Sequence, residues 1–139
     1  MRNRMKRIMI ILLSLTFLLS LSACSVERLS TEKIREIDFT VIEEKNIPEE
    51  LQVMISEKEN TPFKMTYADQ GELFVAQGYG AQQTSGYSIE VKECFETENA
   101  IYVHTNLIGP SKEEKIVETE TYPYIVIKME FIDKNVVFQ

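Results

Sequence analysis

Alternation of apolar and polar residues dominates this chain from Phe63 to its end. Phe63, Met65 and Tyr67 alternate with polar neighbours, and Asp69-Gln70-Gly71 then supplies a turn. The same period of two returns in two later runs, at 87–95 and 101–107, and the run at 122–129 is the most apolar of the predicted strands. A strand with one face in a core has this pattern, so we predict a mainly β (α+β) domain. We expect a single antiparallel sheet, curled or sandwich-like, of six or seven strands.

One helix is predicted before these strands. Apolar residues recur at helical spacing from Ile47 to Ile55. Asn46 is a candidate cap, and Pro48 suits the first turn because its missing N–H would have no partner there. The helix should end near Lys58.

The N-terminus has the order of a secretory signal. Four basic residues lie between Arg2 and Arg7, and the 14 residues from Ile8 to Leu21 carry no charge. This apolar run is shorter than the roughly 20 residues that span a membrane, which favours a cleaved signal. Leu21-Ser22-Ala23-Cys24 then matches a lipobox, so we expect lipid on the Cys24 thiol.

These features divide the chain into three parts. Residues 1–23 are predicted to be a lipoprotein signal peptide, residues 24–36 a lipidated tether, and residues 37–139 the folded domain. The domain should open with a half-buried strand, since apolar residues alternate at 37–41. The expected location is extracytoplasmic, anchored to the bacterial cell membrane by the lipid on Cys24.

Charge and cysteine content limit the possible functions. Eleven basic and 22 acidic residues follow residue 23, which makes a formal charge of −11 for the predicted mature chain. Such a chain is repelled by phosphate backbones, so we expect no nucleic-acid partner. Cys94 has no second cysteine once Cys24 carries lipid, and we interpret it as a structural thiol. His104 is the one histidine and has no metal-ligand spacing around it, so no metal site is expected. No spacing pairs two carboxylates on one strand face and no catalytic motif is present, so we expect no cofactor and no enzymatic activity.

The segment from Gly78 to Tyr87 is the candidate binding site. It holds three of the five glycines and two tyrosines, and such a loop can approach another surface closely. We hypothesise that a partner protein contacts Tyr79, Gln82, Gln83, Thr84 and Tyr87, with Tyr79 exposed. The alternative is a structural connection whose glycines serve turn geometry and whose tyrosines lie in the core.

Two segments resemble a known family. The first runs from Gly78-Tyr79-Gly80 to Val91, and the second is Tyr122-Pro123-Tyr124-Ile125-Val126-Ile127-Lys128. Both are similar to the C-terminal domain of the protease complex subunit PrcB family, and the resemblance extends over roughly 39–138. It implies a non-catalytic accessory subunit that stabilises an exported protease or tethers it to the cell envelope.

Two other functions remain open from the sequence. The first is a protease inhibitor that uses the Gly78–Tyr87 loop, because Thr84-Ser85-Gly86-Tyr87 resembles a loop of chagasin-type inhibitors of cysteine proteases. The second is an envelope lipoprotein that binds a ligand in a groove lined by its aromatic residues. The partners expected in the leading interpretation are the membrane and an exported protein, of which a protease is the example that the resemblance implies.

Overall fold

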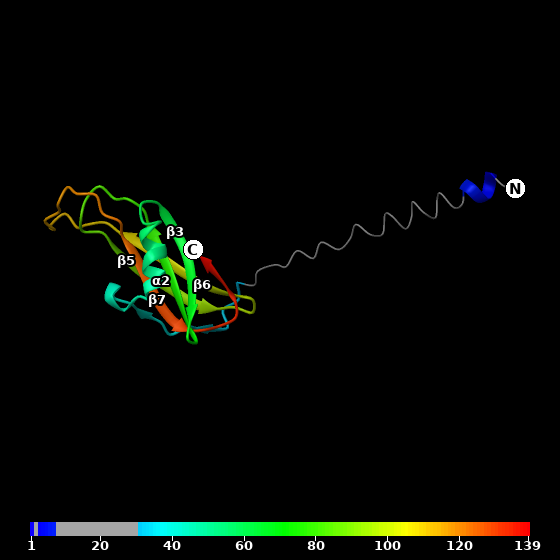
Figure 1. Cartoon of the computed structure of the whole chain (residues 1–139), viewed down its shortest axis with the longest axis horizontal. Helices are drawn as coiled ribbons and strands as arrows, with labels where there is room; N and C mark the ends of the chain where they lie inside the picture. Colours follow the sequence, from blue (N-terminus) through cyan, green and yellow to red (C-terminus); the bar gives the residue numbers. More distant parts are fainter. Residues whose placement is uncertain (2, 8–30) are drawn as a thin grey trace.

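The computed structural model describes Met1, residues 3–7 and residues 31–139, and Figure 1 shows the whole chain. Most of the predicted signal peptide, the predicted lipidation site Cys24 and the first part of the predicted tether lie outside the described residues. Within the described part, no helix is long and apolar enough to cross a membrane.

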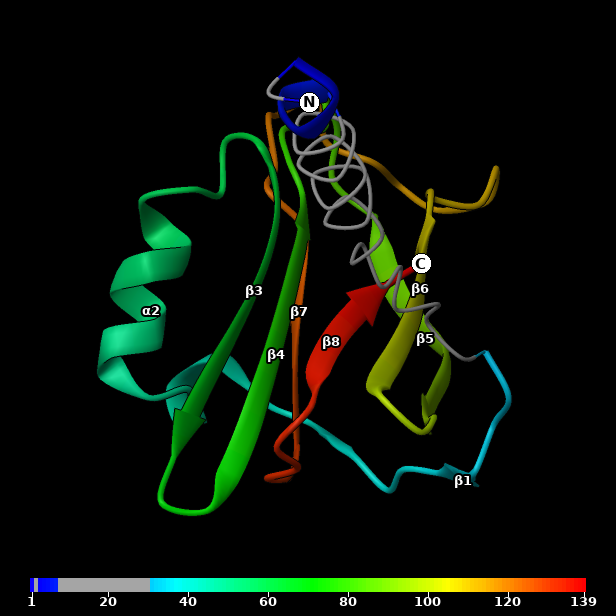
Figure 2. The ribbon, with the colours of Figure 1, turned by 90° about the vertical axis from the view of Figure 1, so that its right-hand side faces the viewer.

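The folded part consists of two sheets packed face to face with short helices beside them (Figure 2). The first sheet has the order β1-β5-β6-β8, from β1 (Arg35–Glu36), β5 (Ser88–Glu96), β6 (Ala100–Ile108) and β8 (Asn135–Phe138). The second has the order β2-β7-β4-β3, from β2 (Thr40–Val41), β7 (Tyr124–Glu130), β4 (Glu72–Tyr79) and β3 (Pro62–Asp69). The mainly β prediction is therefore confirmed. The single sheet of six or seven strands is imprecise, because the described residues form eight strands in two sheets.

The predicted hairpin is formed by β3 and β4, which pair antiparallel from Pro62↔Tyr79 to Asp69↔Glu72. Both turn residues have positive φ, 47° at Gln70 and 79° at Gly71. Two-residue hairpin turns with this geometry suit the right-handed twist of the strands that they connect. The pairing is not antiparallel throughout, however. β8 runs parallel to β6, because residues 131–134 carry the chain from the second sheet across to the first before β8 begins.

The residues at 37–41 do not form the predicted strand. Arg35 and Glu36 pair with β5, whereas Thr40 and Val41 pair with β7 of the other sheet. Ile37 lies at the crossing, where its side chain is buried between the sheets and its N–H donates to the Cys94 carbonyl at 2.9 Å. Apolar and polar residues do alternate at 37–41, but they belong to a segment that crosses from one sheet to the other and not to one strand.

The helix is shorter than predicted and is not capped by Asn46. Residues Glu44–Asn46 form the 3₁₀ helix η2, and α2 spans Glu49–Ser56 with Pro48 at its N-cap. No side chain caps α2. Instead, Gln52 donates its side-chain amide to the carbonyls of Ile47 and Glu44, at 2.8 and 3.0 Å.

Two apolar clusters hold these layers together. The first lies between the sheets and includes Val75, Ile101, Val103 and Ile127. The second lies between α2 and the outer face of the β3–β4–β7 sheet, where Leu51 is fully buried. β4 and β7 are consequently buried on both faces, which explains their nearly continuous apolar sequences.

Candidate functional site

The loop after β4 is not isolated, because it pairs with the long polar loop before β7. Gln82 and Thr121 exchange two backbone hydrogen bonds, of 2.8 and 2.9 Å. The Ser85 N–H donates to the Val117 carbonyl at 3.0 Å. We call residues 80–87 together with 109–121 the paired-loop lobe. It forms the end of the domain away from β1 (Figure 1).

Side chains reinforce this pairing. The Thr121 hydroxyl donates to the Thr84 carbonyl at 2.7 Å, and the Val117 N–H donates to the Ser85 hydroxyl at 2.8 Å. Short polar side chains therefore satisfy backbone groups that would otherwise need water. The lobe is thus a defined shape rather than two independent loops.

The glycines of the Gly78–Tyr87 segment have structural explanations. A Cβ on Gly78 would lie 2.2 Å from the Phe63 ring, which packs across this point of β4. Gly86 has a φ of +91°, and a Cβ there would lie 2.7 Å from that of Pro110. Packing and turn geometry therefore account for these two glycines without a partner.

The five predicted contact residues are not equally accessible. Tyr79 lies at the end of β4 and is half-buried, not exposed, because its hydroxyl hydrogen-bonds to that of Thr105 in the other sheet at 2.6 Å. Gln82, Thr84 and Tyr87 are also half-buried, and Gln82 donates its side-chain amide to the Tyr79 carbonyl at 3.3 Å. Gln83 is the one fully exposed member of the set.

Two residues that the sequence analysis did not select lie on the same lobe. Ile116 and Val117 are 45% and 60% exposed, although both are β-branched and apolar. They interrupt a loop in which all the residues from Ser111 to Glu120 are exposed. Two adjacent apolar residues in a charged loop are a usable sequence signal for an interaction surface, because an exposed apolar pair has no role in a core.

The second resembling segment forms the entry to β7 beside the lobe. Tyr122 donates its hydroxyl to Glu120, and this hydrogen bond, followed by burial, raises the pKa of the Tyr122 phenol. Burial, followed by the charges of Glu44 and Glu59, also raises the pKa of Tyr124. Both phenols are therefore neutral hydrogen-bonding groups at physiological pH.

Cys94 is a buried thiol in the core between the sheets, as predicted. Burial, with a smaller effect of the Glu36 charge, raises its pKa to about 11, which disfavours the reactive thiolate. His104 pairs in register with Glu93 rather than with Cys94. Over Met1, residues 3–7 and residues 31–139, no group of three His, Cys, Asp or Glu side chains is arranged to hold a metal ion.

Comparison with known proteins finds a similarity for the central part of the domain. Residues 73–130, from β4 to β7, match the family model described as PrcB C-terminal. The match contains both resembling segments and the whole paired-loop lobe, but not α2, β3 or β8. No curated protein and no solved structure matches the chain. Residues 73–130 are therefore similar to the PrcB C-terminal family.

Proposed function

We propose that this protein is a lipid-anchored accessory subunit that stabilises or tethers an exported protease at the cell envelope, without catalytic activity of its own. The observation that carries the proposal is the PrcB C-terminal match over residues 73–130, since PrcB is a family of protease-complex accessory subunits. The basic, apolar and Leu21-Ser22-Ala23-Cys24 order supports the anchor.

In this proposal the paired-loop lobe contacts the protease. Its exposed Ile116 and Val117 supply apolar contact area, and Gln83, which is exposed on the same lobe, supplies a side-chain amide. Gln82, Thr84, Tyr79 and Tyr87 hold the lobe in shape and contribute their accessible atoms. The lobe lies away from β1, which forms the last two residues of the predicted tether, so a lipid on Cys24 would leave the lobe directed away from the membrane.

The test is recovery of the tagged chain from detergent-solubilised membranes of the producing cell, followed by an assay of co-eluting proteolytic activity. Val117→Asp should reduce the recovered activity at least tenfold. Val53→Asp is the matched control, because Val53 on α2 is 53% exposed, close to the 60% of Val117. Equal recovery with both variants, with folding intact, would show that the lobe is not the contact surface.

The recovered protease also separates accessory subunit from inhibitor. The purified chain should lengthen the half-life of protease activity at 37 °C and leave its initial rate unchanged. A stoichiometric loss of the initial rate would instead identify an inhibitor. Recovery of the chain without any proteolytic activity would contradict the association with a protease.

The anchor is tested separately by Cys24→Ala. Two acyl chains bind a membrane stably, at about 0.8 kcal/mol per buried CH₂ group. The variant should therefore leave the detergent phase in a phase-partition assay, or accumulate as the precursor. An unchanged mature mass and unchanged partition would exclude lipid on Cys24.

A further inference from the structure

The two long sides of the sandwich are closed differently. On one side the extended segment from β1 to β2 crosses between the sheets, pairs with a strand of each, and inserts Ile37 into the core. On the other side the sheets end in β3 and β8, and these two edge strands do not pair with each other. Within residues 31–139, the connection at 131–134 crosses this side only beside the β3–β4 turn, where the Phe131 N–H donates to the Gly71 carbonyl at 3.0 Å.

The inner face of β3 is exposed as a result. Its outer-face residues Phe63, Met65 and Tyr67 pack in the cluster with α2, whereas Lys64, Thr66 and Ala68 point toward the open side and are exposed. An eight-residue edge strand with one uncovered face is unusual, because natural sheets blunt or cover their edges.

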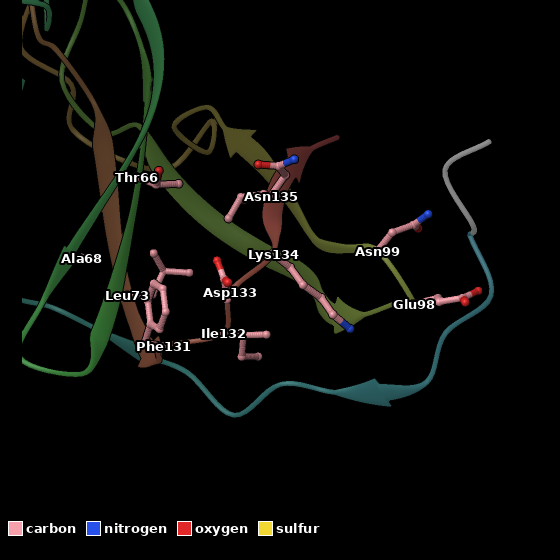
Figure 3. Close-up of a pocket in the computed structure, with 11 residues that line it drawn as sticks. Thr66, Ala68, Leu73, Glu98, Asn99, Phe131, Ile132, Asp133, Lys134 and Asn135 are labelled. Carbon is pink, nitrogen blue, oxygen red and sulfur yellow. The ribbon is translucent and has the colours of Figure 1, made fainter. Parts of the chain in front are cut away.

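Two hollows follow one another along this face. One has a volume of about 570 Å³ and is lined by Thr66 and Ala68 of β3 and by residues 131–136 (Figure 3). The other has a volume of about 390 Å³ and is lined by Pro62, Lys64, Gln77 and Tyr79, among others. We call the two together the β3–β8 groove. The Lys64 ammonium lies 5.7 Å from the centroid of the Phe138 ring, so β3 and β8 form opposite walls.

An unpartnered polar group lies at the base of this groove. Gln77 is directly opposite Lys64 in the β3–β4 register, and it is only 7% exposed. Its Oε1 atom is buried and accepts no hydrogen bond from any described residue. A buried acceptor without a donor destabilises the free protein, whereas a ligand that supplies an N–H or O–H donor relieves this cost.

The charged residues of the groove indicate which charge a ligand should carry near Lys64. Among the described residues Lys64 forms no salt bridge, in contrast to Lys134, which binds Glu96 at 2.6 Å. Asp133 lines the other hollow of the groove, the one that Lys64 does not line (Figure 3). An extended segment with an acidic residue near Lys64 would complement this arrangement, and the Lys64 end also contains the unpartnered Gln77.

We propose that the β3–β8 groove binds an extended segment of a protein partner, which adds as a strand to the free edge of β3, donates a hydrogen bond to Gln77 and places an acidic side chain beside Lys64. The partner segment covers the open side in the way that residues 35–41 cover the opposite side. It places one of its own apolar side chains between the sheets, as Ile37 does on the opposite side. Main-chain hydrogen bonds to β3 supply affinity, and the two hollows select alternate side chains. The strands that form its walls, β3 and β8, lie outside the family match, and the groove is tested with its own peptide and variants, so its test does not depend on the proposed function of the lobe.

The probe is a blocked, fluorescein-labelled octapeptide of alternating valine and threonine with one aspartate, titrated against the full chain and followed by anisotropy. Its affinity should exceed that of the same peptide with lysine in place of aspartate by at least fivefold. Thr66→Arg, which fills the groove, should weaken binding at least tenfold. Thr40→Arg is the matched control, since Thr40 is an exposed threonine on the short strand at the opposite edge of the same sheet.

Gln77→Met distinguishes a binding role from a structural one. It retains the side-chain volume without the unpartnered amide, so the free chain should gain thermal stability while the octapeptide binds at least fivefold more weakly. A lower thermal midpoint, or unchanged peptide affinity in both Gln77→Met and Thr66→Arg, would overturn the proposal. So would a concentration-dependent dimer in sedimentation that Thr66→Arg abolishes, because the groove would then bind a second copy of this chain.

Discussion

Gly78→Ala offers a direct test of how the candidate segment is packed. The substitution adds one methyl group next to the last residue of β4, at a position without a positive φ. The new Cβ would lie 2.2, 2.6 and 2.8 Å from three carbon atoms of the Phe63 ring. Because carbon atoms pack at about 3.5–4.0 Å, the ring must retreat by more than about 1 Å.

Phe63 cannot retreat freely, because it is buried in the cluster that contains Leu51 and Ile55. Overpacking of this kind costs about 1–3 kcal/mol, and the short contact distance puts this case near the upper value. Replacing a strand glycine by alanine recovers about 0.5–1 kcal/mol of backbone entropy. The expected net loss of unfolding free energy is therefore about 2 kcal/mol.

Urea unfolding of the purified chain measures this loss. With a slope of about 2 kcal/mol per molar urea, the midpoint should fall by about 1 M. The double variant Phe63→Ala/Gly78→Ala should be no less stable than Phe63→Ala alone, because the clash disappears with the ring. A Gly78→Ala variant within about 0.5 kcal/mol of wild type would refute the packing argument. The glycine would then need another explanation, such as close approach of a partner.

Three further outcomes are expected. Gly86→Val should lower the unfolding free energy by about 2 kcal/mol, because it combines a φ of +91° with the contact to Pro110, and an unchanged urea midpoint would contradict this. In a Cys24→Ser background, Cys94 should react with a disulfide reagent at pH 8 only after unfolding, since burial raises its pKa to about 11; fast reaction of the native chain would exclude a buried thiol. Hydrogen bonds from Lys134 and then Arg35 lower the pKa of the Glu96 carboxyl group. The ion pairs of Glu96 therefore stabilise the fold fully above its unfolded-state pKa of about 4.3, and this stabilisation is lost as the pH falls through the lower folded-state pKa. Lys134→Met should therefore make the stability less dependent on pH below about 4.3, and an unaltered pH profile would show that the pair contributes nothing.

Local features of the fold could be predicted because they depend on neighbouring residues. The β3–β4 hairpin follows from alternation around Gln70-Gly71, and α2 follows from apolar spacing near Leu51. The number of sheets could not be predicted in the same way. Alternation indicates that one face of a strand is buried, but it does not indicate which sheet or which neighbouring strand covers that face.

The candidate site was also predictable in its local features and unpredictable in its long-range contacts. The sequence indicated the Gly78–Tyr87 segment from its composition, yet it did not indicate that residues 109–121 pair with it. Exposure of Gln83 and partial burial of Tyr79 depend on that pairing and on Thr105, which lies in the other sheet. Ile116 and Val117 were available as a signal, but their polar surroundings made the loop resemble a simple connection.

The sequence by itself determined the periodicity of the strands, the turn at Gln70-Gly71, the apolar face of α2 and the resemblance to the PrcB C-terminal domain. These properties follow from backbone preferences and side-chain spacing over a few residues. Only the tertiary structure decided that Ile37 crosses between two sheets, that Gly78 accommodates Phe63 and that the β3–β8 side is left open. Each of these depends on contacts, or on the absence of a covering segment, between residues far apart in the chain, which local patterns do not encode.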